Sequence, residues 1–139
     1  MTEQAYAGLD KLERESRLPP RSATRKAAGG PKEAEVLRAI LRALERFPGV
    51  HAIRLNAGLT VLGAGSSRRA IRGCEPGTPD VLVMLAGGRV LWLEVKTAVG
   101  KLSPSQRAWH ARASLLGHSV HVVRDVSTAT NLVREAEAR

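Results

Sequence analysis

The order of its segments predicts that the chain adopts an α/β fold, in which helices cover a central sheet on both faces. Two short neighbouring strands are apolar on both of their faces, and helical segments precede and follow them. Hydrophobic residues make up 43% of the 139 residues, which is enough for a core, whereas aromatic residues make up only 3%. The core must therefore consist mainly of Leu, Val, Ile and Ala.

The chain divides into a basic N-terminal appendage with a linker (residues 1–30) and a folded domain (residues 31–139). A short polar helix is predicted over Ala7–Leu18, and Pro19-Pro20 ends it. Ser22–Gly30 is small, basic and ends in glycine, which is typical of a linker. The appendage is interpreted as a solvated tail, with DNA contact by its basic residues left open.

The first element of the domain is a helix over Pro31–Phe47. Its apolar residues recur at helical spacing, and Pro48-Gly49 ends it. Alternation over Val50–Asn56 predicts a strand. The following segment, Gly58–Gly77, is rich in glycine and arginine and is predicted to form a mobile hairpin or loop.

The second half of the domain contains the two strands that are apolar on both faces. They span Asp80–Leu85 and Arg89–Lys96. A helix then opens at Ser103 and ends at Gly117, since Ser-x-x-Gln is a helix-capping pattern and glycine favours a helix end. A further strand is predicted over Ser119–Arg124, and Ser127 is predicted to cap a final helix.

The charge of the chain is strongly positive and predicts a polyanionic partner. Lys and Arg number 22 against 13 Asp and Glu, a net charge of +9. Nucleic acid is the commonest such partner, although composition alone leaves open an anionic membrane surface or a small phosphate ligand. No apolar run approaches the roughly 18 residues that span a bilayer, and no secretory signal is recognisable. The single cysteine, Cys74, excludes an internal disulfide framework, so we expect a reducing cytoplasm.

Three polar residues at the ends of the two apolar strands are candidates for chemistry: Asp80, Glu94 and Lys96. Two carboxylates at one sheet edge can hold a hard divalent cation, with water and phosphate oxygens completing its shell. Lys96 lies two residues after Glu94, hence on the same face of the strand. Its ammonium can orient a nucleophilic water or neutralise a scissile phosphate. The alternative is a pair of unrelated strand-end charges, but a charge within the apolar run around Glu94 is costly without a partner.

The two carboxylates can meet only if the turn between the strands has the right length. If Leu85 pairs with Arg89 across three loop residues, Asp80 stands opposite Glu94 on one face. A two-residue turn sends the carboxylates to opposite faces. We therefore predict a three-residue loop or a bulge, with glycine in the left-handed conformation.

Several spaced blocks extend these residues into a longer pattern: Gly77-Thr78-Pro79-Asp80, Glu94-Val95-Lys96 and Gly100-Lys101-Leu102-Ser103-Pro104-Ser105-Gln106, with Arg54-Leu55-Asn56-Ala57-Gly58 and Arg72-Gly73 upstream. This pattern resembles the VRR-NUC family of nucleases within the PD-(D/E)xK superfamily, over about residues 32–133. It is most similar to the stand-alone, often phage-borne members. The resemblance implies a restriction-endonuclease-like core with a mixed central β-sheet flanked by α-helices, in a bacterial or phage-infected cell.

The resemblance also implies phosphodiester hydrolysis that depends on Mg²⁺ or Mn²⁺, with DNA as the partner. Some stand-alone members resemble dimeric Holliday-junction resolvases, so a homodimer that acts on branched or four-way junction DNA is expected. Carried over by position, the resemblance implies that Asp80 and Glu94 bind metal, that Lys96 is catalytic and that Gln106 lines the site. Together with residues chosen for their charge and position, the candidates form three sets: catalytic Asp80, Glu94, Lys96, Glu33 and Gln106; metal-binding Asp80, Glu94, Val95 and Glu33; DNA-binding Asn56, Arg68, Arg69, Arg72, Lys101 and Ser103. Leu37 departs from the family, whose helices often carry Gln there, which leaves one polar contact in doubt.

Several assignments have a plainer alternative. Gln106 forms a capping box with Ser103 and need not reach the site. Arg68, Arg69 and Arg72 are good candidates for phosphate contact, with a merely solvated loop as the alternative. Trp92 and Trp109 are interpreted as core residues, and no histidine shows metal-ligand spacing with a carboxylate. Two further function classes stay open: a nuclease of other specificity (restriction or nicking type) and a non-catalytic DNA-binding module.

Glu33 and Glu35 are predicted to differ in role although they are two residues apart. Glu33 lies three before Val36 and four before Leu37, so it extends the buried stripe of the helix and should point inward. Glu35 lies on the charged face. We therefore predict that Glu33 reaches the metal site, directly or through water. The alternative is that Glu33 only complements the positive end of the helix dipole.

Overall fold

The computed structural model describes residues 31–139, so the predicted helix at Ala7–Leu18 and the linker at Ser22–Gly30 lie outside the described residues. The described part is mixed α/β, as predicted. Its elements, in chain order, are α2 (Glu33–Leu44), β1 (His51–Arg54), β2 (Leu59–Leu62), β3 (Arg69–Arg72), β4 (Val81–Met84), β5 (Val90–Val95), α3 (Pro104–Leu115), β6 (Val120–Val123) and α4 (Val126–Glu137), with short 3₁₀ turns at Gly65–Ser67 and Ala86–Gly88.

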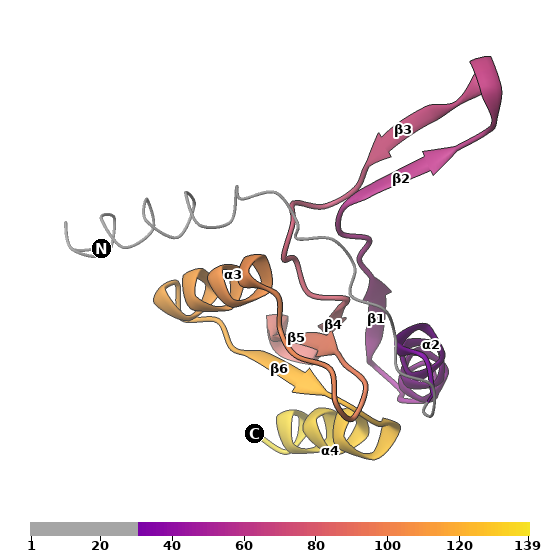
Figure 1. Ribbon diagram of the computed structural model, residues 1–139. Coiled ribbons are helices and arrows are strands. Elements are labelled where there is room, and N and C mark those ends of the chain that lie inside the picture. The colour runs from indigo at the N-terminus through magenta and orange to yellow at the C-terminus, as the bar shows by residue number, and fades with distance from the viewer. Residues whose placement is uncertain (1–30) are drawn as a thin grey trace.

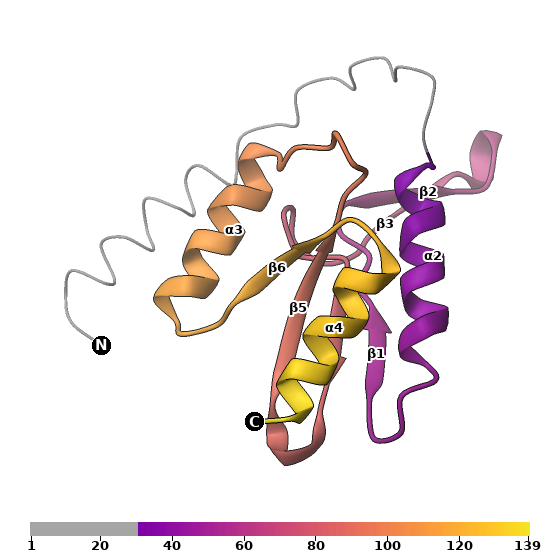
Figure 2. The ribbon, with the colours of Figure 1, turned by 90° about the horizontal axis from the view of Figure 1, so that it is seen from below.

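Four of the strands form a mixed sheet in the order β1-β4-β5-β6 (Figure 1). The β1–β4 and β4–β5 pairs are antiparallel, whereas β5 and β6 are parallel because helix α3 connects them. Helices α2 and α4 lie side by side against one face, and α3 lies on the other (Figures 1 and 2). The predicted mixed sheet flanked by helices is therefore confirmed.

The hydrophobic core lies between the sheet and the α2–α4 layer. Alternate residues of β4 and β5 supply its sheet side, among them Val81, Val83, Leu93 and Val95, each fully buried. On α2 the buried residues Val36, Leu37, Ile40 and Leu44 recur at three- and four-residue spacing, which places them on one stripe. Since side chains alternate along a strand, Glu94 points away from this core and toward α3.

Two predicted details are wrong. Asp125, not Ser127, caps the last helix: its carboxylate accepts a hydrogen bond from the Thr128 N–H at 2.7 Å, because its extended backbone places the side chain over the first turn.

Trp92 and Trp109 lie outside the main core cluster. Both are half-buried and contact each other with ring centroids 5.1 Å apart, because α3 covers its face of the sheet only partly.

The glycine- and arginine-rich segment folds as a hairpin, one of the two predicted alternatives. Strands β2 and β3 pair over four residues each and form a separate two-stranded sheet. The hairpin extends away from the body of the molecule (Figure 1). Within the described residues, no helix is long and apolar enough to cross a membrane.

Candidate active site

The β4–β5 turn places Asp80 opposite Glu94, as the predicted register requires. Three residues form the loop, and the Leu85 N–H donates to the Arg89 carbonyl at 2.9 Å. Gly87 and Gly88 have positive φ values of 77° and 75°. Val81 pairs with Leu93, so Asp80, one residue farther from the turn, lies opposite Glu94. There the Asp80 Oδ2 accepts a hydrogen bond from the Val95 N–H at 2.8 Å.

Glu94 is the centre of the site and is fully buried. Its Oε1 lies 2.9 Å from Lys96 Nζ and also accepts a hydrogen bond from Gln106 Nε2. Burial raises the pKa of Glu94 to about 7, with the Asp80 and Glu33 charges adding to the rise and Lys96 opposing it. Such a perturbed carboxyl group is typical of functional sites.

Lys96 joins the acidic residues into one cluster and is only 6% exposed. Burial by itself lowers the pKa of Lys96, but the hydrogen bond and charge of Glu94, with the Glu33 and Asp80 charges, raise it above its usual value. Lys96 therefore carries a positive charge at neutral pH, close to both carboxylates.

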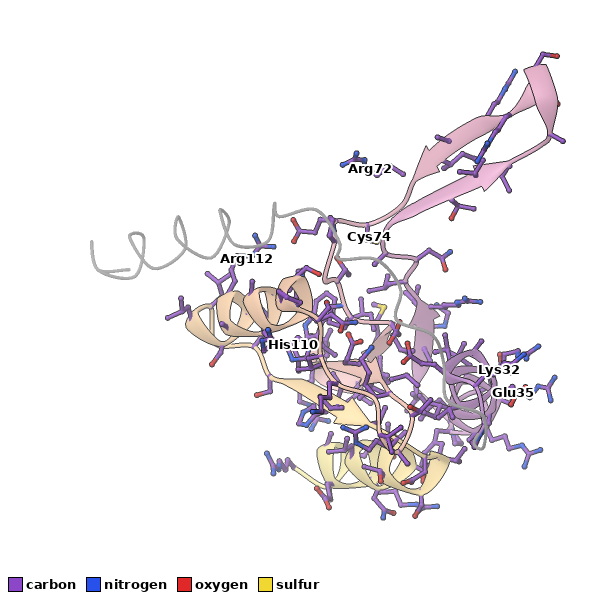
Figure 3. All side chains as sticks on the ribbon, viewed as in Figure 1. Lys32, Glu35, Arg72, Cys74, His110 and Arg112 are labelled. Atoms are coloured by element: carbon purple, nitrogen blue, oxygen red, sulfur yellow. The ribbon has the colours of Figure 1, made fainter. Side chains whose placement is uncertain are left out.

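Glu33 and Glu35 occupy the two different positions that their helical spacing predicts. Glu33 Oε1 lies 3.5 Å from Lys96 Nζ, and its side chain is 43% exposed, so it reaches the edge of the cluster. Glu35 is exposed, and its Oε2 accepts a hydrogen bond from the Lys32 N–H at 3.1 Å, which caps the helix (Figure 3). That Glu33 also binds metal stays a prediction.

If the cluster hydrolyses DNA with a metal, as the resemblance implies, replacing Glu33 by glutamine should lower cleavage by about 10–100-fold, the usual cost of losing a group that supports a metal site. Glu35→Gln is the matched control, because glutamine still accepts from the Lys32 N–H. Its activity should stay near normal, and the melting temperatures of both variants should change little. Initial cleavage rates and thermal melts measure both effects, and equal activity in the two variants would limit the catalytic set to Asp80, Glu94 and Lys96.

Gln106, in the first turn of α3, takes part in the helix cap and also contacts Glu94. The two roles predicted for Gln106 as alternatives, helix capping and a place in the site, therefore both occur. Gln106 Oε1 accepts from the Ser103 N–H at 2.8 Å, and Ser103 Oγ accepts from the Gln106 N–H at 3.2 Å. The remaining amide group of Gln106 donates to Glu94. Gly77 fixes this turn against the sheet, because a Cβ at residue 77 would lie 2.2 Å from the Ser105 carbonyl oxygen.

His110 lies beside Glu94, although it was not among the predicted site residues. It lies four residues after Gln106 on α3, hence on the same helix face, and that spacing is the signal that identifies it. His110 Nε2 is 3.9 Å from Glu94 Oε2, and among the described residues neither buried atom has a hydrogen-bond partner. Burial lowers the pKa of His110, and the Lys96 charge lowers it further, so the ring is neutral at pH 7.

A polar cleft of about 380 Å³ opens beside these residues. It brings together Asp80, Gln106, Asn56 and Ser103. The remaining predicted DNA contacts are exposed and lie outside the residues that line it: Lys101 precedes α3, and Arg68, Arg69 and Arg72 belong to the protruding hairpin. Sequence reasoning did not assign the other lining residues, including Arg54 and Thr60, to the site.

The cluster offers a divalent cation the carboxylates of Asp80 and Glu94, and Glu33 lies at its edge. No group of three His, Cys, Asp or Glu side chains is placed to hold a metal in the described part of the chain. Asp80 and Glu94 face each other across the hairpin, and Glu94 Oε2 is a buried acceptor without a hydrogen bond there. A hard cation accepts such oxygen ligands and takes the rest of its shell from main-chain carbonyls, water and phosphate.

Comparison with known proteins identifies the family. The family model of the VRR-NUC domain matches residues 21–125. A solved structure described as a VRR_NUC domain is 25% identical, with a TM-score of 0.52, over 73% of this chain and 94% of that chain. No curated protein matches the chain. The chain therefore belongs to the VRR-NUC family, and it is a nuclease-type DNA-binding domain.

Proposed function

We propose that the protein is an endonuclease that uses Mg²⁺ or Mn²⁺ to hydrolyse DNA phosphodiester bonds, preferentially in branched or four-way junction DNA. One observation carries the proposal. Asp80 lines a polar cleft, and beside it Glu94 is fully buried and 2.9 Å from Lys96. A buried carboxylate is costly, and a bound cation offsets that cost.

Each residue of the cluster has a separate role in the proposed reaction. Asp80 and Glu94, with the main chain of Val95, would hold the cation, which supplies Lewis-acid stabilisation of the phosphate and activates water. Lys96 orients the attacking water and neutralises charge that develops on the phosphate. Gln106 holds the Glu94 carboxylate in place at the N-terminus of α3, where the helix dipole favours an anionic phosphate.

The chemistry of the cleft favours an enzyme over a non-catalytic binding module. A surface that only binds DNA gains nothing from two carboxylates, because they repel phosphate. The Glu94 carboxylate is fully buried, is held by two hydrogen-bond donors and carries a perturbed pKa. A restriction or nicking specificity requires the same residues, so it differs from the proposal only in the preferred DNA substrate.

A cleavage panel tests the proposed function. The pure protein is incubated with linear duplex, single strand, flap, fork and four-way junction, each with Mg²⁺, Mn²⁺ or EDTA. We expect cleavage with either metal, fastest on branched substrates, and none in EDTA. Robust cleavage in EDTA would overturn the metal-dependent mechanism. Equal rates on linear duplex and junction would replace branch preference by a restriction or nicking specificity.

The pKa of Glu94 predicts how cleavage depends on pH. Its carboxylate must lose a proton to bind metal, and its pKa of about 7 means that the metal-free protein holds that proton in acid. At limiting Mg²⁺, cleavage should therefore fall by about tenfold per pH unit below pH 7. Saturating Mg²⁺ should displace the proton and shift this decline to lower pH. Rates measured at both metal concentrations check this, and superimposable pH profiles would contradict it.

We also propose that the working protein is a homodimer. A two-fold axis allows two small domains to cut the symmetric strands of a junction. The proposal rests on the similarity to stand-alone family members. Multi-angle light scattering at assay concentration should give twice the mass of the chain, and a monomer that still cuts junctions would reject it.

A further inference from the structure

The β2–β3 hairpin, which we call the arm (residues 57–74), carries no catalytic group of the proposed mechanism. It projects from the body as a two-stranded ribbon (Figure 1). The arm contains three arginines, Arg68, Arg69 and Arg72, and no Asp or Glu. An isolated two-stranded ribbon is only marginally stable in water, so a bound partner would add to its stability.

The side chains of the arm divide between its two faces in an unusual way. Directly paired residues share a face, so Leu62 and Arg69 lie together with Ile71, whereas Val61 shares the other face with Arg72. Val61, Leu62 and Ile71 are 42%, 51% and 50% exposed. Each face thus presents one arginine and at least one exposed aliphatic side chain, and Arg72 points into open space (Figure 3).

This distribution indicates a partner that contacts both faces. A ribbon that packs on a protein surface, including a second copy of this chain, would carry its apolar residues on one face and its charges on the other. The major groove of DNA has two walls and admits a two-stranded ribbon. Phosphates border the groove on both sides, which matches one arginine on each face of the arm.

The base of the arm is attached to the candidate active site. The Cys74 N–H donates to the Asn56 carbonyl at 2.7 Å, and the Leu55 N–H donates to the Asp80 carbonyl at 2.8 Å. Asn56, at this base, also lines the cleft, and so does Thr60 on β2. A DNA duplex bound around the arm would therefore lie next to the candidate active site around Glu94.

We propose that the arm enters the major groove of the duplex next to the cleaved bond. Arg69 and Arg72 contact phosphates on opposite sides of the groove, and Val61, Leu62 and Ile71 contact apolar groups on base edges, such as thymine methyls. This inference rests on the proposed function for its choice of DNA as the partner. It adds a binding mode that makes intact duplex necessary beside the cut.

Methylation of bound linear duplex by dimethyl sulfate tests the binding mode, with EDTA present so that no cleavage occurs. The reagent modifies guanine N7 in the major groove and adenine N3 in the minor groove. We expect the wild-type protein to protect guanine N7, and the double variant Leu62→Ser/Ile71→Ser to lose that protection. Leu115→Ser/Leu116→Ser is the matched control, because these side chains on or next to α3 are 48% and 47% exposed. Its protection should match the wild type.

The salt dependence of binding tests the two arginines separately. Arg69→Gln/Arg72→Gln should flatten the slope of log K against log[salt] by about two units, roughly one for each lost phosphate contact. The control Arg38→Gln/Arg42→Gln removes the same charge from the exposed side of α2 and should change the slope less. An equal change in both double variants would mean that the arm acts only through net charge, which overturns the inference.

Two further outcomes would overturn the proposed binding of the arm in the major groove. The first is protection of adenine N3 alone. The second is a wild-type dimer that becomes monomeric in Leu62→Ser/Ile71→Ser while guanine N7 stays protected. The second would make the arm an interface between copies. Failure of the inference is distinguishable from failure of the proposed function, because footprinting in EDTA requires no catalysis. A protein that cleaves DNA with metal but leaves guanine N7 unprotected loses only the arm's binding mode.

Discussion

Replacing Glu94 by glutamine is expected to abolish DNA cleavage while DNA binding stays near the wild-type level. Glutamine keeps the shape of the side chain but removes the negative charge that the proposed cation requires. A loss of about 4 kcal/mol of transition-state stabilisation corresponds to roughly a thousandfold lower rate. Binding should persist because the removal of an acidic group does not weaken the attraction to phosphate. Asp80→Asn should behave in the same way.

The same substitution separates loss of chemistry from loss of folding. Glutamine removes the cost of burying the ionised Glu94 carboxylate, but it also takes the closest anion from buried Lys96, which keeps only Glu33 at 3.5 Å. The melting temperature should therefore fall by less than in Lys96→Met, and the protein should stay folded. Calorimetric titration with Mn²⁺ should show no binding by Glu94→Gln. Glu45→Gln, at an exposed position, is the control and should behave as wild type in every assay. Cleavage by Glu94→Gln within about tenfold of the wild type would exclude Glu94 as a metal ligand.

The central pairing of the site is predictable from sequence because local rules fix it. A strand places alternate residues on one face, and the length of a hairpin loop sets the register between two strands. Three loop residues between Leu85 and Arg89 were therefore enough to place Asp80 opposite Glu94. The inward position of Glu33 follows in the same way from the spacing of the buried residues on α2.

The features that the sequence left undecided depend on contacts between distant segments. His110 approaches Glu94 only because α3 packs across that face of the sheet, and no local pattern shows that packing. Trp92 and Trp109 have the spacing of core residues, but the cover that α3 provides is incomplete, so both stay half-buried. Asp125 and Ser127 are both good capping residues, and the backbone conformation at the helix start decides between them.

Replacing Lys96 by methionine is expected to lower cleavage by about 10²–10³-fold, the usual cost of one donor to a developing negative charge. Methionine keeps the apolar stem of the side chain but leaves Glu94 buried without its closest cation, 2.9 Å away. Breaking a buried pair in this way costs about 3–5 kcal/mol of stability when the remaining group stays charged. The variant should therefore be both slow and less stable at neutral to alkaline pH.

The pH dependence of that instability identifies its cause. Without Lys96 the folded-state pKa of Glu94 rises further above its ordinary value of 4.5, because Lys96 is the group that opposes the rise. In acid, Glu94 is protonated in both the folded and unfolded states, so the loss of stability linked to its ionisation is absent. Between about pH 4.5 and 7 the unfolded state ionises first in both proteins, so both lose stability alike. Above about pH 7 Glu94 ionises in the folded wild type but not yet in the folded variant, so the difference in stability between them should grow there.

Thermal melts of Lys96→Met, wild type and the exposed control Lys101→Met across this range measure the effect. A constant difference in melting temperature at every pH would mean that Lys96 stabilises the fold by packing alone. Cleavage rates at the highest pH where Lys96→Met melts like wild type then isolate the chemical role of the ammonium. Near wild-type turnover there, at saturating metal, would make Lys96 a structural partner of Glu94 rather than a catalytic residue.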